Sequence, residues 1–158
     1  MEPRTSSPDQ RLNAVEQLAK HGVPVSVNVA PVIPGLNDEE IPAILEESAS
    51  RGASTARYIL LRLPYGVKDL FTAWLQREIP ERAGRVLNRI LDVRDGKLND
   101  SSFATRMKGS GEIASAIEQL FKSVCRKYGL NSKGVLLATD KFIRPSDDAG
   151  QSELAFLE

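Results

Sequence analysis

The sequence predicts an α/β protein with a βαβ core of parallel strands, followed by helices toward its C-terminus. Residues 23–29 place valine at every second position, a pattern typical of a strand. A helical pattern follows up to Gly52, and a second apolar stretch at 56–63 stops at Pro64. Strands joined through one helix by short links pair in parallel. We therefore expect the loops after the two strands, 31–38 and 62–66, to leave the sheet at the same edge.

Composition and charge narrow the class of protein. Of the 158 residues, 41% are hydrophobic and 27% are charged, which is close to the globular average. Lysine plus arginine and aspartate plus glutamate are each 21, so the chain is not a strongly basic nucleic-acid binder. No apolar run approaches the ~20 residues that span a bilayer, and the N-terminus has no apolar signal core. We expect a cytoplasmic protein with no membrane contact.

The chain has a single cysteine, Cys125, and a single histidine, His21. An internal disulfide, a cysteine-rich zinc site and a complete cysteine-ligated cluster are therefore excluded. His21 lies in the last turn of a helix before Gly22, where an imidazole complements the helix C-terminus. Cys125 lies on the apolar face of the last helix, which indicates a packed thiol and not a nucleophile. No metal ligands are predicted.

The helix boundaries follow from capping residues and apolar spacing. The first helix spans about 8 to 21, with a capping box of Ser7 and Gln10 and with Pro8 at the first helical position. Asn37 or Asp38 is expected to cap the second helix. The third helix has the clearest stripe, formed by Val67, Leu70, Phe71, Trp74 and Leu75, and we interpret its tryptophan as a core residue.

Three regions follow from this pattern. Residues 1–66 contain helix, strand, helix and strand, and residues 67–140 form a helical extension that includes a helix from Pro80 and a last one at about 112–128. Residues 141–158 are polar and contain proline and glycine, so we expect a flexible tail.

Two loops are candidates for ligand binding. In the turn at 31–39, Gly35 allows close backbone approach and helix-start amides are free to donate, although an ordinary strand-to-helix connection has the same residues. The loop at 97–111 combines Lys97, Arg106 and Lys108 with Gly-Ser-Gly before a helix, which suits an anion. The alternative for residues 97–111 is a solvated surface loop. Spacing along the chain singles out no pair of catalytic carboxylates.

At these residues the chain resembles the C-terminal half of a radical S-adenosylmethionine (SAM) protein of the DNA repair photolyase-like subgroup, which is related to spore photoproduct lyase. The resemblance covers nearly the whole chain. Its most specific elements are Pro-Gly-Leu-Asn-Asp at 34–38 and Gly-Lys-Leu-Asn-Asp-Ser at 96–101. Further matches are Glu2-Pro3-Arg4, Ser7-Pro8, Ala30-Pro31-Val32-Ile33, Leu61-Arg62-Leu63-Pro64, Phe71, Trp74-Leu75, Arg106-Met107, Phe142 and Arg144-Pro145.

The resemblance implies a partial, half TIM-type radical SAM barrel and an adenine-binding edge. Members of this family support adenine with Gly-x-Ile-x-Gly-x-x-Glu at the fifth strand; here Ile33 and Gly35 match, while Pro31 and Asp38 replace the first Gly and the final Glu. The end of the next strand resembles the other adenine contact. The implied cofactor-binding residues are Ile33, Pro34, Gly35, Asp38, Leu63 and Pro64, and no catalytic residue is identified.

One departure from the family is severe. The Cys-x-x-x-Cys-x-x-Cys loop that binds the [4Fe–4S] cluster is absent, and so is the glycine-rich motif for the SAM amino group. By resemblance, residues 1–66 form the C-terminal part of the partial barrel, so the cluster-binding half is missing. The resemblance therefore implies a lyase-like radical SAM enzyme of which this chain is an inactive fragment.

Two other functions remain open. The chain could be a non-catalytic interaction module whose exposed strand edges pair with the missing N-terminal half or with a second copy. It could also bind nucleic acid through the 97–111 loop and the helix after it. A nucleic-acid substrate is suggested by the subgroup's label alone, since a fold does not fix a substrate.

Overall fold

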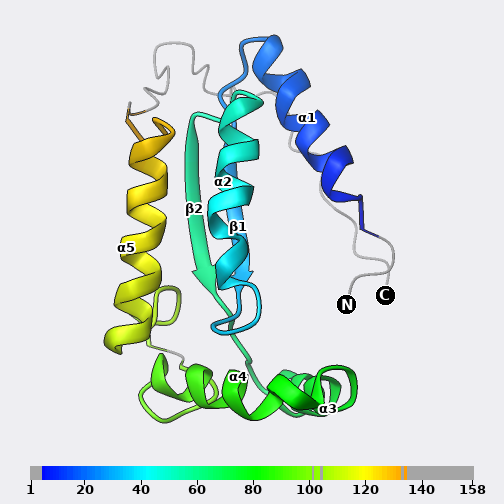
Figure 1. The fold of residues 1–158 in the computed structure, drawn as a ribbon, viewed down its shortest axis with the longest axis vertical. Helices are drawn as coiled ribbons and strands as arrows, with labels where there is room; N and C mark the ends of the chain where they lie inside the picture. Colours follow the sequence, from blue (N-terminus) through cyan, green and yellow to red (C-terminus); the bar gives the residue numbers. More distant parts are fainter. Residues whose placement is uncertain (1–4, 101, 104, 133, 135–158) are drawn as a thin grey trace, which may run out of the picture.

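The fold was analysed in a computed structural model, which describes residues 5–100, 102, 103, 105–132 and 134 (Figure 1). The elements, in chain order, are α1 (Pro8–Lys20), β1 (Ser26–Val32), a 3-10 turn η1 (Asp38–Glu40), α2 (Ile41–Ser50), β2 (Thr55–Leu60), α3 (Val67–Glu78), α4 (Pro80–Asp92) and α5 (Gly111–Lys127). The predicted tail at 141–158 and the resemblance matches Phe142 and Arg144-Pro145 lie outside the described residues. In the part of the chain that is described, no helix combines the length and the apolar character needed to cross a membrane.

The described sheet has two strands, β1 and β2, which pair in parallel. The register runs from Ser26 opposite Thr55 to Val29 opposite Tyr58, and it shifts before Val32. Since α2 connects the two strands, the predicted parallel βαβ unit and the α/β class are confirmed. Two strands do not establish the half TIM-type barrel that the resemblance implies.

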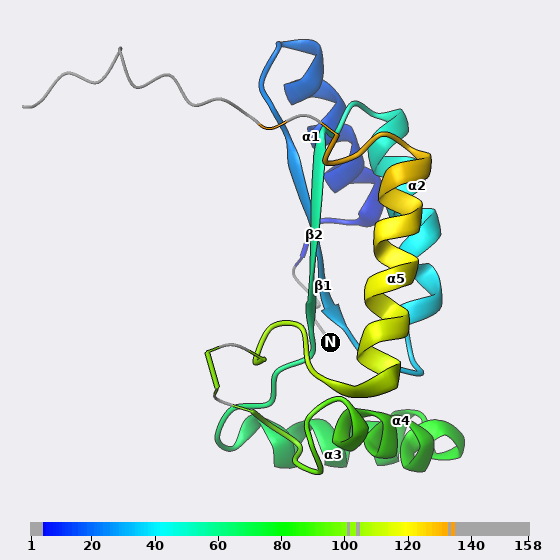
Figure 2. The ribbon, with the colours of Figure 1, turned by 90° about the vertical axis from the view of Figure 1, so that its left-hand side faces the viewer.

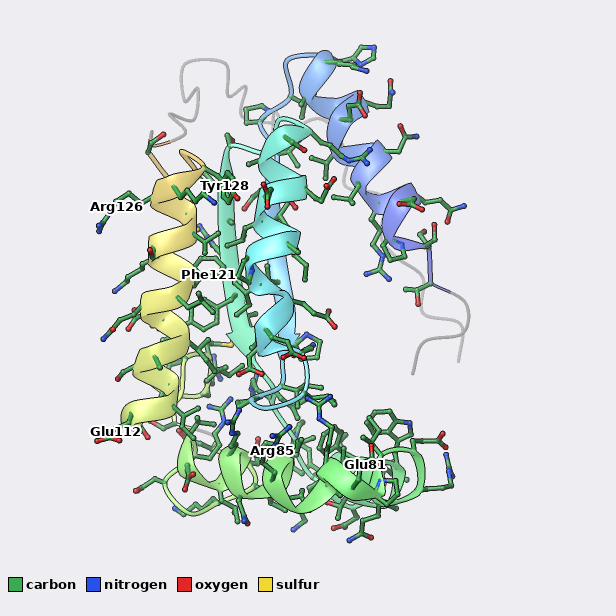
Figure 3. All side chains as sticks on the ribbon, in the orientation of Figure 1. Glu81, Arg85, Glu112, Phe121, Arg126 and Tyr128 are labelled. Carbon is green, nitrogen blue, oxygen red and sulfur yellow. The ribbon has the colours of Figure 1, made fainter. Side chains whose placement is uncertain are left out.

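Helices α2 and α5 cover one face of the sheet (Figure 2). Successive strand residues point to opposite faces of the sheet. The side chains on the face toward α2 and α5 are apolar. Tyr58 on β2 contacts Phe121 on α5, with ring centroids 4.8 Å apart, and Figure 3 shows Phe121 pointing from α5 toward the strands. The strands and these helices share one core, formed by Val29, Val32, Ile41, Leu45, Ala56, Leu60, Ile117, Phe121 and Val124.

Helices α3 and α4 form a separate layer across the carboxyl end of the strands (Figure 1). They bury a second cluster that contains Ile33, Leu63, Phe71, Leu75, Ala83, Val86 and Ile90. The stripe predicted for α3 is only partly core: Phe71 and Leu75 are buried and Trp74 is half-buried, but Val67 is 47% and Leu70 is 74% exposed. Periodicity identified the apolar face of α3, whereas the position of α4 decided how much of that face is covered.

The predicted range of β1 and the predicted cap of α2 were wrong. The first strand lies at Ser26–Val32 and not at 23–29, so it reaches three residues further toward the Pro-Gly turn. Asn37 does not cap the second helix with its side chain, and neither does Asp38, because a 3-10 turn precedes α2 and both side chains bond to the loop before it. The capping box of Ser7 and Gln10 is confirmed.

Candidate functional site

The candidate site is the carboxyl edge of the two-stranded sheet. The loops that follow β1 and β2 both leave the sheet here, as the βαβ pattern predicts. The amide of Leu61, the first residue after β2, donates a 2.8 Å hydrogen bond to the carbonyl oxygen of Val32, the last residue of β1. Ile33 and Leu63, one from each loop, then pack in the same buried cluster. The structure therefore brings together the two segments that were predicted from separate motifs.

The loop after β1 is held by its own side chains. The Asn37 carboxamide accepts a 2.7 Å hydrogen bond from the Ile33 amide and donates to the Pro31 carbonyl at 3.1 Å. The Asp38 carboxylate accepts a 2.8 Å hydrogen bond from the Gly35 amide. The Asn-Asp pair that looked like a helix cap thus satisfies two amides of the turn, Ile33 and Gly35, whereas the prediction for the helix-start amides stays a prediction.

Gly35 is required by the protein's own packing. Its φ is +82°, a backbone conformation that side-chain-bearing residues rarely adopt, and a Cβ there would lie 2.8 Å from Cδ of Arg89. The Gly35 carbonyl accepts a 2.7 Å hydrogen bond from the guanidinium of Arg82, which also lies on α4. The close approach predicted for a ligand is made by α4 instead.

The six residues implied as cofactor contacts differ in exposure. Ile33, Pro34, Gly35 and Leu63 are buried, whereas Pro64 and Asp38 are half-buried. A carboxylate oxygen of Asp38 lies 3.8 Å from the Arg89 guanidinium, so this side chain links the loop to α4. These residues build a rigid edge, and the side chains of Ile33 and Leu63 face α3 and α4.

Arg94 is a site residue that the sequence analysis missed. It is only 2% exposed, and its guanidinium donates hydrogen bonds to the carbonyl oxygens of Leu61 at 2.8 Å, Thr105 at 3.1 Å and Leu60 at 3.3 Å. Burial lowers the pKa of Arg94, and the Asp100 carboxylate acts in the opposite direction. The sequence offered no signal for this role, because Arg94 follows an amphipathic helix as an ordinary charged residue.

In the predicted anion site at 97–111, the amides of Gly109 and Ser110 already have partners. Gly109 donates to the Thr105 carbonyl at 2.7 Å, and Ser110 donates to the Val93 carbonyl at 3.0 Å. A Cβ on Gly109 would lie 2.7 Å from that same Val93 oxygen, so the glycine serves internal packing. These bonds do not involve the amides of the first turn of α5, so the anion site at the start of this helix stays a prediction.

Two of the three cations of the same loop, Arg106 and Lys108, also have partners. The Arg106 guanidinium lies 4.5 Å from the ring centroid of Phe103, and the Lys108 ammonium lies 3.7 Å from a carboxylate oxygen of Glu118. The Asp100 carboxylate accepts hydrogen bonds from the Ser102 amide and the Thr105 hydroxyl, and these bonds lower its pKa. The loop is thus a folded connection that carries Thr105 to Arg94.

The sheet face opposite α2 and α5 is polar and open. Ser26, Asn28 and Ala30 of β1 and Arg57 of β2 are exposed on it. In a one-sided sheet such a face is solvated, and in a barrel it faces the interior.

The single histidine and the single cysteine have structural roles. Nδ1 of His21 lies 2.7 Å from the Gln17 carbonyl at the end of α1, and Cys125 is 4% exposed with its pKa raised by burial. Both interpretations from the sequence are confirmed. Within the described residues, no group of three or more His, Cys, Asp or Glu side chains is arranged to hold a metal ion.

Comparison with known proteins yields distant relatives only. No family model and no solved structure matches the chain. An uncharacterized protein of Mycobacterium bovis and two of Mycobacterium tuberculosis are each 32% identical to it over 87 residues, which is 54% of this chain. The matched part is 26% of each relative, so the chain spans about a quarter of the length of these proteins.

Proposed function

We propose that this chain is the C-terminal part of a radical SAM enzyme and forms the adenine side of its cofactor site. The observation that carries the proposal is the joined carboxyl edge, where Ile33 and Leu36 of the first loop pack with Leu63 of the second in one cluster, beside an open sheet face. Ligands of parallel α/β sheets are held at this edge. The radical SAM family is inferred from the spacing of Ile33 and Gly35, which resembles the adenine-binding motif of that family.

An iron–sulfur cluster does not fit this chain. The sequence has one cysteine, which is buried on the inner face of α5, and a [4Fe–4S] cluster is held by cysteine thiolates that one residue cannot provide. The cluster would have to be bound by other sequence, and no catalytic step is assigned to it here.

SAM fits this edge only in part. The backbone and the half-buried Pro64 supply an apolar wall, but the Ile33 and Gly35 amides are already bonded to Asn37 and Asp38. These amides therefore cannot donate to the edge of an adenine unless the loop rearranges. No reaction step through SAM follows from this geometry. Ile33 and Leu63 hold the edge in place through the buried cluster.

The chain's own residues would position the edge and contact the substrate. Arg94 fixes the end of β2 through three carbonyl groups, while Arg82 fixes the loop after β1. Asn28 and Arg57 on the open face offer an amide and a cation to a polar substrate. A DNA lesion is one such substrate, and its phosphates would pair with Arg57.

The test compares this chain with a longer relative. If the proposal holds, either Mycobacterium tuberculosis relative, reconstituted with iron and sulfide without oxygen, is expected to form 5′-deoxyadenosine from SAM and dithionite, and this chain alone is expected to form none. A chimera in which this chain replaces the matching segment should keep that activity.

In the chimera, Arg57→Ala should lower turnover of a DNA substrate, whereas Arg85→Ala on the exposed side of α4 should not. Absence of the product from the relative, or its formation by this chain alone, would contradict the proposal.

An interaction module is the second candidate, and a groove beside β1 favours it. The groove has a volume of about 470 Å³ between α1, α2 and the outer edge of β1, and Leu12, Val15, Val27, Ala30 and Ile44 line it. Helix α1 has no buried residue, so its apolar stripe is only partly covered. Size-exclusion chromatography with light scattering would show a concentration-dependent dimer if this edge pairs with a second copy. A monomer at all concentrations would exclude that self-association.

A further inference from the structure

A second groove, the β2–α5 groove, lies along the edge of β2 that faces away from β1. Its volume is about 660 Å³, and small-molecule sites typically have volumes of about 300–1,000 Å³. Ala56 and Tyr58 of β2 line it together with Phe121 and Cys125 of α5. The groove therefore has the size of a ligand site, and part of its lining is apolar.

Hydrogen bonds close both ends of this edge of β2. At one end, the Asn131 side chain pairs with the amide and the carbonyl of Ala56. At the other end, the Leu60 amide donates to the Met107 carbonyl at 2.9 Å, and the Leu60 carbonyl accepts from the Arg94 guanidinium at 3.3 Å. A further strand therefore has no continuous ladder to join here, and the space between the two ends suits a small molecule.

Tyr58 lies between these two closed positions. Backbone groups along a strand alternate between its two edges with a period of two residues, so Tyr58 directs its amide and carbonyl to the same edge as Ala56 and Leu60. Within the described part of the chain, no group bonds to the Tyr58 backbone on this edge. The groove therefore offers a ligand one hydrogen-bond donor and one acceptor from the same residue.

The Asn131 carboxamide shows which chemistry satisfies such a pair. Its oxygen accepts from the Ala56 amide at 2.9 Å, and its nitrogen donates to the Ala56 carbonyl at 3.0 Å. A planar group with an acceptor beside an N–H donor thus matches both backbone groups of one residue of β2. Nucleobases carry such an acceptor and donor side by side on their edges.

The rim of the groove is positively charged. Of the described residues that line it, Arg57, Lys108, Lys122 and Arg126 are cationic, and Glu118 alone is acidic. The Glu118 carboxylate lies 3.7 Å from the Lys108 ammonium and 2.9 Å from the Lys122 ammonium. One carboxylate does not balance four cations, so the rim favours a ligand that carries an anionic group.

We propose that the β2–α5 groove binds a nucleoside monophosphate. The base pairs with the backbone of Tyr58 as the Asn131 carboxamide pairs with Ala56, and one face of the base lies on the apolar lining formed by Phe121 and Cys125. The phosphate lies among the cations of the rim. This site is separate from the edge formed by 31–38 and 62–66, and it does not depend on SAM.

Isothermal titration calorimetry of the full chain tests the ligand class. We expect at least one of AMP, CMP, GMP and UMP to bind at least ten times more tightly than ribose 5-phosphate, which lacks the base. The corresponding nucleoside, which lacks the phosphate, should also bind at least ten times more weakly than its monophosphate. Equal affinity for ribose 5-phosphate, equal affinity for the nucleoside, or no binding of any monophosphate overturns the proposal.

Charge reversal on the rim tests the position of the phosphate. The Lys122 side chain is 66% exposed, so Lys122→Glu changes the rim without entering the core, and it should weaken binding by about tenfold. Lys20→Glu on α1 is the matched control, because its side chain is 59% exposed and lies outside the groove. Equal affinities of the two variants would contradict a phosphate on this rim.

Amide hydrogen exchange, followed by NMR, locates the base. The bound nucleotide should slow exchange of the Tyr58 amide at least tenfold and leave the Asn28 amide on the outer edge of β1 unchanged. Slower exchange of the Ile33 or Gly35 amide instead would place the nucleotide at the carboxyl edge, which contradicts this site and supports the adenine site proposed there. An unchanged Tyr58 amide in the presence of bound nucleotide also overturns the proposal.

Discussion

The carboxamide of Asn131 pairs with both backbone groups of Ala56. Its oxygen accepts from the Ala56 amide at 2.9 Å and its nitrogen donates to the Ala56 carbonyl at 3.0 Å, across 75 residues of sequence. Asn131 has a φ of +61°, a conformation that asparagine tolerates better than most residues. One side chain therefore takes the place of a neighbouring strand and ties the end of α5 to the start of β2.

Asn131→Ala is expected to destabilise the protein by about 1–3 kcal/mol, because it removes two hydrogen bonds and leaves the Ala56 amide without a partner. Urea unfolding followed by circular dichroism measures the change. Ser132→Ala is the matched control, since it removes one hydrogen bond between Ser132 and the Gly129 carbonyl on the surface. A loss no larger than that of the control would mean that the Asn131–Ala56 pair contributes nothing specific.

Arg94→Met is expected to cost about 2–4 kcal/mol of unfolding free energy, because three carbonyl groups lose their donor in a buried place. Arg94→Lys should recover only part of this loss, since an ammonium group cannot reach all three oxygens as a planar guanidinium does. Arg85→Met on the exposed side of α4 controls for the loss of a positive charge. Equal stability of the Arg94→Met and Arg85→Met proteins would refute the bracing role.

Two glycine substitutions should change stability in opposite directions. Gly35→Ala forces a side chain into a φ of +82° and against Arg89, so we expect it to destabilise the protein by at least about 1 kcal/mol. Gly84→Ala lies within α4 with nothing within 4 Å of the added Cβ, and it should stabilise by about 0.5–1 kcal/mol. Thermal unfolding of the two variants gives the signs, and a stabilised Gly35→Ala protein would contradict the tight packing on α4.

The stability of the protein should fall between pH 10 and about 12 because of Tyr58. Burial, aided by the Glu118 carboxylate, raises the pKa of Tyr58 to about 12. In this range the unfolded state loses the phenol proton first, so it binds fewer protons than the folded state and the unfolding free energy decreases as pH rises. The difference between wild type and Tyr58→Phe isolates this effect from other titrating groups. The Tyr58 hydroxyl has no hydrogen-bond partner among the described residues, so Tyr58→Phe should not destabilise the protein at pH 7.

Parts of the fold could be predicted because they depend on local patterns. The alternation of valines, the capping box at Ser7 and the stop at Pro64 each describe a few neighbouring residues, and the βαβ rule then fixes that the two strands are parallel. The shared edge of the two loops follows from the same rule. The family assignment and the cofactor remain predictions, since motif spacing carries them.

The internal bonds of the two loops could not be predicted from the sequence. The amides of Ile33, Gly35, Gly109 and Ser110 are each satisfied by a side chain or carbonyl that only the fold places there. An unpaired amide is costly wherever water is excluded, so a folded chain finds partners for its own loops. No local pattern could show that Asn37 and Asp38 would bond back to the loop instead of capping α2.

The sequence by itself determined the helices, the two strands, their parallel pairing and the absence of a cysteine cluster, because these follow from periodicity, connectivity and composition. The tertiary structure decided which side chains brace the edge: Arg94, Arg89 and Asn131 reach partners 33 or more residues away. Such contacts depend on the distance between elements in space, which chain order does not encode locally.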